Sequence, residues 1–86
     1  MEEERMTLEG FMELSLTYRA QYLWAYGSKM TIKVFTKYAF TLYQLEDFFV
    51  EVTYSSDENK ITSIEAFDNT EHLLGYVDDI QLNHIL

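Results

Sequence analysis

The order of apolar and polar positions predicts one helix at the start of the chain. From Thr7 to Tyr26, apolar residues recur at three- and four-residue steps, as they do on one face of an α-helix. Thr7 is a residue type that caps helix N-termini, and Gly27 is the type that follows helix C-termini with a positive φ. We therefore expect a long N-terminal helix over residues 7–26 that ends at Gly27.

Beyond this helix the apolar period changes to two, which is typical of β-strands, and β-branched and aromatic residues dominate. The alternating run is longer than an ordinary strand. The apolar residues that share one parity in it are Met30, Ile32, Val34, Tyr38, Phe40 and Leu42. The run predicts two strands, about 30–36 and 38–45, that meet at Thr36–Lys37. Because neither Gly nor Asn marks that turn, one long bent strand is the alternative.

A second pair of strands follows a turn at Leu45–Asp47. Residues 48–54 alternate cleanly, and residues 55–60 are polar and rich in turn-forming Ser, Asp and Asn. The return strand, Ile61–Phe67, has imperfect alternation, which a β-bulge near Thr62–Ser63 explains.

The chain ends in a predicted short helix, about 70–78, after a helix-start cluster of Asp, Asn and Thr. Helix, strands and helix in this order predict a single α+β domain over residues 1–86. In it, a long N-terminal helix packs on a 3–4-stranded antiparallel meander, because a meander with one apolar face must cover that face. The charged residues 1–6 are expected to be disordered.

Composition narrows the class of protein. The 86 residues contain no cysteine, so a disulfide framework and a thiolate metal site are both excluded. The chain opens Met-Glu-Glu-Glu-Arg, the opposite of a basic signal-peptide start, and no apolar run reaches the ~18 residues of a membrane span. We expect a cytoplasmic protein with no membrane partner.

Negative charge is concentrated in the second half of the sequence. Residues 1–45 hold five acids and five bases, whereas residues 46–86 hold ten acids and one base, which gives the formal net charge of −9. Such a half repels phosphate and attracts basic partners. The candidate acidic surface consists of Glu46, Asp47, Glu51, Asp57, Glu58, Asp78 and Asp79.

No residue pattern predicts catalysis, a metal site or a bound cofactor. His72 and His84 have no spaced His, Cys or Glu partner, and the acidic loop around Asp57 lacks calcium-loop spacing and contains Lys60. There is no Gly-rich phosphate loop. We therefore expect a protein that is not an enzyme and that holds no metal or cofactor.

Aromatic residues are more numerous than one core face can bury. Four of them crowd the end of the predicted helix: Tyr18, Tyr22, Trp24 and Tyr26. We expect three to pack on the sheet and one to stay partly exposed, and the alternative is an interface patch. If the alternation continues unbroken, one sheet face carries Phe35, Tyr43 and Phe49 together with Lys33, Lys37, Glu51 and Thr53.

Aromatic side chains on such a face need a cover, and a second subunit is the simplest one. The candidate interface residues are Trp24, Phe35, Tyr43 and Phe49.

The stretch from Leu42 to Tyr54, LYQLEDFFVEVTY, and the hairpin after it resemble a family of small uncharacterised bacterial α+β proteins. Members share an LYxLxDFFVEVxY-type pattern and a Leu…Tyr-hydrophobic-Asp ending, which here reads LLGYVDDIQL. They often carry Pro where this chain has Gly75. The resemblance implies the same fold, implies no activity, and marks Glu51 and Asp78 as positions of interest.

Taken together, these features predict a non-enzymatic protein-interaction module, either a homodimer or an accessory subunit. One alternative is an acidic mimic of nucleic acid that inhibits a basic protein, and another is a small-ligand binder. Direct nucleic-acid binding is disfavoured, because Lys29, Lys33 and Lys37 are expected to form a solvated sheet face.

Overall fold

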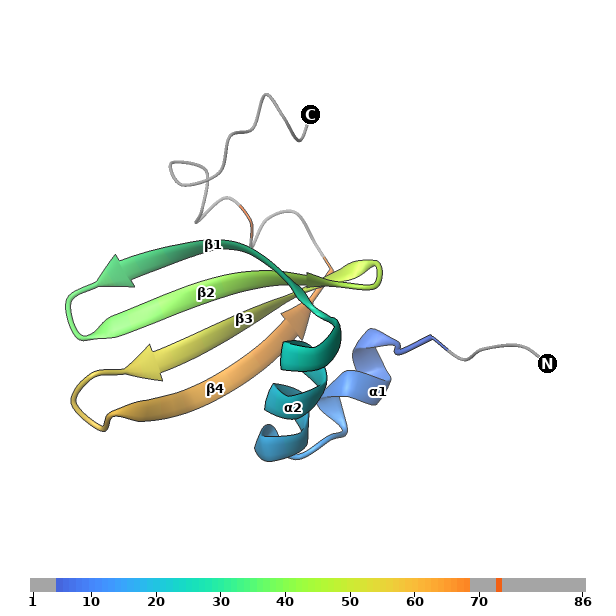
Figure 1. The fold of residues 1–86 in the computed structure, drawn as a ribbon, viewed down its shortest axis with the longest axis horizontal. Helices are drawn as coiled ribbons and strands as arrows, with labels where there is room; N and C mark the ends of the chain where they lie inside the picture. The colour runs from blue at the N-terminus through green and yellow to red at the C-terminus, as the bar shows by residue number, and fades with distance from the viewer. Residues whose placement is uncertain (1–4, 69–72, 74–86) are drawn as a thin grey trace, which may run out of the picture.

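The computed structural model describes residues 5–68 and Leu73. Two helices precede four strands: α1 (Leu8–Met12), α2 (Leu16–Tyr26), β1 (Ser28–Phe35), β2 (Tyr38–Leu45), β3 (Phe48–Ser55) and β4 (Lys60–Phe67). The strands form one antiparallel sheet in the order β1-β2-β3-β4 (Figure 1). The α+β class and the antiparallel meander are therefore confirmed, with four strands. The predicted helix over residues 70–78 lies, apart from Leu73, outside the described residues.

The predicted long helix is wrong, because the chain makes two shorter helices. Thr7 does cap the first helix, its Oγ1 accepting from the Gly10 N–H at 3.0 Å. Ser15 then caps a second helix, its Oγ accepting from the Tyr18 N–H at 3.2 Å. The Ser15 cap begins a second helix, because a Ser side chain competes with the backbone hydrogen bonds of a continuous helix. The break turns the chain so that Phe11 and Leu23 enter the same core.

Gly27 ends α2 without the positive φ that its position predicts. Its φ is −82° and its ψ is 156°, which is extended backbone open to any residue. The requirement for glycine is spatial, because a Cβ here would lie 2.7 Å from Leu23 Cδ1 and 2.8 Å from the Leu23 carbonyl oxygen. The glycine thus lets the chain pass close to the last turn of α2 as it enters β1.

Residues 28–45 form two strands joined by a two-residue turn, as predicted, and not one bent strand. Thr36 takes a φ of 50° in this turn, the left-handed region that β-branched residues rarely adopt. The turn is therefore made by a residue that gives no sequence signal for it.

That turn also changes which side chains share a face. Phe35 pairs with Tyr38, so from Thr31 to Phe35 the odd residues of β1 face the same way as the even residues of β2. Ile32 and Val34 consequently lie on the face opposite Phe40, although all three have the same parity in the sequence. The expectation that one parity holds across residues 30–45 is wrong for this reason.

The predicted bulge in the last hairpin is confirmed. Thr53 pairs with Ser63 and Tyr54 pairs with Ile61, so Thr62 is the extra residue on β4. The bulge brings both Ile61 and Ile64 to the same face, which restores the broken alternation.

The main core lies between the two helices and one sheet face. Phe11 of α1 is fully buried and its ring centroid lies 6.0 Å from that of Phe48. The buried members of this core are Phe11, Leu23, Leu45, Phe48, Val50, Val52 and Ile64. The helices lie over one end of the sheet, and the ends carrying the β1–β2 and β3–β4 turns extend past them (Figure 1).

Candidate functional site

Two aromatic rings, tilted against each other by 32°, are in contact between α2 and β2. Tyr43 lies on the helix-bearing face, and its ring centroid is 5.6 Å from that of Trp24. Trp24 nevertheless remains 54% exposed. The structure therefore brings together two of the four candidate interface residues.

Beyond Trp24 the same face continues uncovered over β1. Ile32 and Val34 project from it with 46% and 70% of their surfaces exposed, opposite the smaller Thr41 and Ala39 of β2. We call the surface made by Trp24, Ile32, Val34 and Tyr43 the β1 patch. Exposed apolar side chains that adjoin one another are a feature of docking surfaces.

Exposure of large apolar groups is confined to one stretch of the described chain. Eight such residues are exposed, all between positions 16 and 38: Leu16, Tyr18, Trp24, Tyr26, Ile32, Val34, Phe35 and Tyr38. Residues 14–45, which contain this stretch, carry four cations and no acid. The expectation that three of the four helix aromatics pack on the sheet is wrong, because α2 leaves Tyr18, Trp24 and Tyr26 exposed.

A shallow hollow adjoins the β1 patch on the helix side. It has a volume of about 280 Å³ and is lined by Leu16, Thr17, Ala20, Gln21, Trp24, Ile61 and Ile64. Its lining is mostly apolar, with Thr17 and Gln21 as its polar members.

The other two candidate interface residues lie on the opposite face of the sheet. Phe49 stacks on Phe67 with ring centroids 5.7 Å apart, in a second cluster around the fully buried Leu42. Leu73 packs against this cluster. Phe35 projects at the end of β1 and is 63% exposed. Phe35 and Phe49 are thus separated by the sheet from Trp24 and Tyr43.

The described residues of the candidate acidic surface occupy three separate places. Glu46 and Asp47 form the β2–β3 turn, whereas Asp57 and Glu58 lie in the β3–β4 turn at the other end of β3, roughly 25 Å away for an eight-residue strand. Glu51 lies between them, directly opposite Glu65 of β4. Asp78 and Asp79 lie outside the described residues.

Three of these acids already have ion-pair partners. The pairs are Glu46 with Arg5 at 2.9 Å, Asp57 with Lys37 at 3.1 Å and Glu58 with Lys60 at 3.5 Å.

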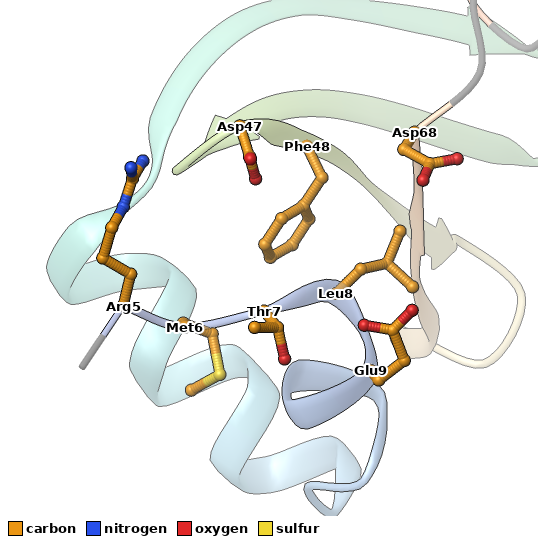
Figure 2. Close-up of a pocket in the computed structure, with 8 residues that line it drawn as sticks. All are labelled: Arg5, Met6, Thr7, Leu8, Glu9, Asp47, Phe48 and Asp68. Atoms are coloured by element: carbon orange, nitrogen blue, oxygen red, sulfur yellow. The ribbon is translucent and has the colours of Figure 1, made fainter.

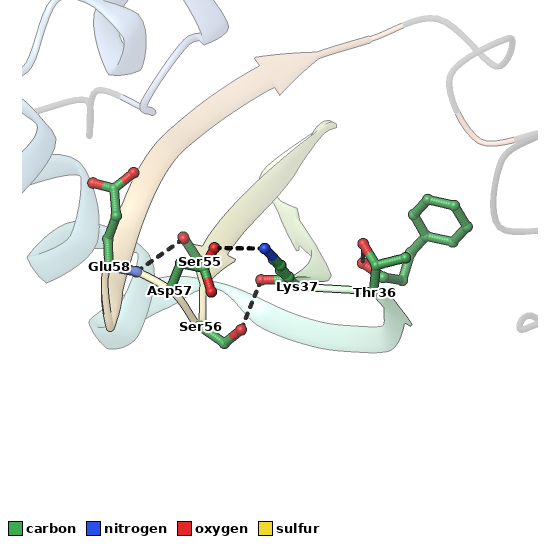
Figure 3. Close-up of polar contacts among 7 residues, drawn as sticks. Thr36, Lys37, Ser55, Ser56, Asp57 and Glu58 are labelled. Atoms are coloured by element: carbon green, nitrogen blue, oxygen red, sulfur yellow. Dashed lines mark hydrogen bonds and ion pairs between the residues drawn. The ribbon is translucent and has the colours of Figure 1, made fainter.

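The two hairpin turns at the free end of the sheet are tied together (Figure 3). The Ser56 N–H donates to the Lys37 carbonyl at 2.9 Å, and the Ser56 hydroxyl donates to the same oxygen at 3.1 Å. The buried Ser55 accepts from the Glu58 N–H at 3.2 Å. These bonds hold the β1–β2 turn against β3, so β1 has a fixed end although α2 does not cover it.

A second hollow, of about 390 Å³, lies where the N-terminal segment meets the β2–β3 turn (Figure 2). Phe48 stands in its centre, with the carboxylates of Glu9, Asp47 and Asp68 around it. Arg5 borders the hollow, and its hydrogen bond to Glu46 raises the pKa of Arg5 above its ordinary value. Among residues 5–68 and Leu73, no group of three His, Cys, Asp or Glu side chains is arranged to hold a metal ion.

Two N-terminal residues, Arg5 and Met6, line this hollow. Of the six residues expected to be disordered, Arg5 forms the ion pair just described and Met6 packs against the main core. Residues 1–4 lie outside the described part. No helix within that part is long and apolar enough to cross a membrane.

Sequence reasoning missed Ile32 and Val34, because it placed them with Phe40 and Leu42 as one apolar face. It also gave Arg19 no role. A signal for the first error existed: a two-residue turn reverses parity from one strand to the next, whatever residues form it.

Comparison with known proteins adds no relative. No protein-family model matches the chain, and neither the curated proteins nor the solved structures contain a match.

Proposed function

We propose that this protein is a non-enzymatic protein-interaction module that binds its partner through the β1 patch. The observation that carries the proposal is that Trp24, Ile32 and Val34, three of the exposed large apolar residues of the described chain, lie on the helix-bearing side of the sheet. Tyr and Trp are enriched among the residues that dominate binding energy, and the Trp24–Tyr43 ring contact gives the patch an aromatic anchor.

The geometry of the patch suits recognition better than catalysis. Its side chains are apolar, and the fixed strand β1 presents Ile32 and Val34 without rearrangement. A preformed surface loses less conformational entropy on binding than a flexible one. The partner is a second copy of this chain or a different protein to which this chain is an accessory subunit.

The acidic-mimic alternative draws less support from the described residues. A mimic of nucleic acid needs carboxylates spaced along one surface, whereas the described acids of the candidate surface occupy three places and three of them are ion-paired. The proposal therefore rests on the β1 patch and not on charge.

Site-specific photo-crosslinking tests the proposal. A photoreactive residue replaces Val34 in one variant and Thr62, an exposed residue of β4, in a matched control. In lysate of the native host, the Val34 variant should give a discrete crosslinked protein, or a crosslinked dimer, that the Thr62 variant does not give. Equal crosslinking from both positions, or none from Val34, contradicts the proposal.

Sedimentation velocity then separates the two kinds of partner. A homodimer predicts a mass that doubles between low micromolar and about 200 μM protein, and a Trp24→Ala variant that stays monomeric over a tenfold wider range. An accessory subunit predicts a monomer throughout this range and a crosslinked product of a different protein.

A further inference from the structure

The two edge strands of the sheet, β1 and β4, differ in whether the helices contact their outward backbone groups. At the β4 edge, Arg19 donates from Nη1 to the Ile64 carbonyl at 2.9 Å, and Met12 Sδ accepts from the Ala66 N–H at 3.3 Å. The helices therefore occupy two of the backbone groups that an added strand would use on β4. Such cover is one way in which proteins block edge strands from pairing with other chains.

The β1 edge has no equivalent cover among the described residues. In a hairpin with a two-residue turn, the flanking residues form a hydrogen-bonded pair and the pairs then alternate. Because Phe35 and Tyr38 flank the turn, the N–H and C=O groups of Ile32 and Val34 point away from β2. Within residues 5–68 and Leu73, no hydrogen bond from another element reaches these groups.

The regular part of this edge is short. A register shift between Lys29 and Thr31 leaves Met30 as a bulged residue. Bulges interrupt edge pairing, so a strand added to β1 has about five residues to pair with, from Thr31 to the turn. Its side chains on the helix-bearing face would adjoin the β1 patch, since cross-strand neighbours share a face.

Charge selects the kind of strand. Lys29, Lys33 and Lys37 follow one another at four-residue steps along β1 and its turn, and residues 14–45 contain no acid. Lys37 is paired with Asp57, whereas Lys29 has no ion-pair partner in the described chain. An acidic segment complements this edge electrostatically.

A second copy of β1 complements the edge less well than an acidic segment does, because it brings further lysines to the edge. Antiparallel pairing of Ile32 with Val34 of the other copy sets Lys33 opposite Lys33, and like charges directly opposite each other are destabilising. Lysine on an edge strand is a recognised device against self-association.

We propose that the β1 edge binds an extended acidic segment of a partner protein, with alternating acidic and apolar residues, as a fifth strand. This inference rests on the proposed function and names the chemistry of the partner. Backbone hydrogen bonds to Ile32 and Val34 supply the pairing, and the β1 patch receives the apolar side chains.

The net charge of −9 repels an acidic partner, whereas the lysines of β1 attract it. The distance of these charges from the added strand decides whether repulsion or attraction dominates. A strand added to β1 would lie three strand spacings from β3, about 14 Å, which is longer than the Debye length of about 10 Å at 0.1 M salt. The lysines of β1 itself lie closer to an added strand than the acids of β3 do. Local attraction therefore dominates, and affinity should fall as salt is raised.

The test uses a labelled peptide, Val-Glu-Val-Glu-Val-Glu-Val, titrated against the full chain. Binding should protect the amides of Ile32 and Val34 from hydrogen exchange at least about tenfold, as expected when exposed edge groups become hydrogen-bonded. The matched peptide Val-Lys-Val-Lys-Val-Lys-Val should bind at least about tenfold more weakly. Binding without protection at these two amides, equal affinity for the lysine peptide, or affinity that rises with salt overturns the proposal.

Variants at the edge separate backbone pairing from side-chain contact. Val34→Pro removes the outward N–H and should lower the affinity for the glutamate peptide at least about tenfold. Val34→Thr keeps that N–H and should lower the affinity less than about threefold. Circular dichroism checks that both variants fold.

Should Val34→Pro unfold, Lys29→Glu gives the same test without touching the backbone. This variant should lower the affinity for the glutamate peptide at least about fivefold at low salt. Lys60→Glu, on the opposite edge, makes the same change in net charge and should have little effect.

The outcomes also separate this inference from the proposed function. A Val34 crosslink to a different protein, with no binding of the glutamate peptide, leaves the interaction module standing and overturns the added strand. A Val34 crosslink to a second copy, or a duplex oligonucleotide that displaces the peptide, likewise overturns it. Peptide binding with no crosslink from Val34 supports the edge chemistry and contradicts the interaction module in its host.

Discussion

At the scale of single residues, a few positions adopt conformations that their side chains disfavour. Thr36, Glu46 and Asn59 have positive φ, one in each of the three hairpin turns. Asn tolerates this region, because its short polar side chain bonds locally, whereas a β-branched residue does not. Thr36 is therefore the position where the backbone holds the most strain.

Thr36→Gly should stabilise the protein by about 1 kcal/mol, because glycine adopts a positive φ without steric penalty. The hydrogen bond from Thr36 Oγ1 to the Phe35 carbonyl, 2.7 Å, is lost, but it is exposed and contributes little. Urea unfolding measures the change. Lys37→Gly, at the neighbouring turn residue without positive φ, should be destabilising, and equal effects of the two variants would contradict the strain at Thr36.

A second residue-scale effect concerns the tyrosine under Trp24. Burial raises the pKa of Tyr43 above its ordinary value of about 10. In alkaline solution the unfolded chain therefore loses this proton at a lower pH than the folded chain does, and stability falls as pH rises from about 10 through the raised pKa. Below pH 10 the contribution is fully present.

Tyr43→Phe should accordingly lose less stability above pH 10 than the natural chain does. Unfolding by urea at pH 8, 10 and 11 measures this difference. Tyr22→Phe should act in the same direction, since burial and the nearby Glu46 charge also raise the pKa of Tyr22. Parallel pH profiles for the natural chain and Tyr43→Phe would show that this phenol titrates alike in both states.

At the scale of elements, Arg19 joins three of them. Its Nη2 donates to the Met12 carbonyl at 2.6 Å and its Nη1 to the Ile64 carbonyl at 2.9 Å, so α2 is tied both to the end of α1 and to β4. Its Nε is buried without a hydrogen-bond partner in the described chain. A guanidinium can reach both carbonyls at once because its donors lie in a rigid fork.

Arg19→Met should destabilise the protein by about 2–3 kcal/mol, because two helix and strand carbonyls lose charged donors. Arg19→Lys should recover only part of this loss, since an ammonium group cannot span both acceptors. Arg5→Met is the matched control: it removes an ion pair with Glu46 in which Arg5 is exposed, and it should destabilise the protein less than Arg19→Met does. A loss at Arg19 no larger than that at Arg5 would contradict the structural role of Arg19.

At the scale of the whole molecule, charge and apolar exposure are segregated. The acid-free residues 14–45 build α2, β1 and β2, whereas most acids belong to residues 46–86. Within the described part, Glu51 and Glu65 face each other across β3 and β4. Acidic self-repulsion is therefore concentrated on one side of the sheet, away from the β1 patch.

Glu65→Lys should stabilise the protein by about 0.5–1 kcal/mol. It replaces a like-charge cross-strand pair by a pair of opposite charges, and it makes the net charge less negative. Thermal unfolding in 10 mM and 500 mM NaCl measures the gain, which should shrink at high salt as the Debye length falls. Glu65→Gln should give part of the gain. A gain that is independent of salt would assign the effect to packing.

The sequence by itself determined the fold class, the antiparallel meander, the Thr7 cap and the bulge at Thr62. Each of these depends on local chemistry: a hydroxyl that meets a free N–H, a period of two, an apolar residue out of phase. The segregation of acids is likewise a property of the chain alone.

Only the tertiary structure decided which side chains meet. The two-residue turn at Thr36 reverses the parity of β1 against β2, and this places Ile32 and Val34 on the face opposite Phe40, where they are exposed in the β1 patch. The Ser15 cap divided the helix, and the direction of α2 then set which part of the sheet stayed uncovered. The covered β4 edge and the uncovered β1 edge follow from where Arg19 and Met12 reach, which is a matter of distance in space and not of position along the chain.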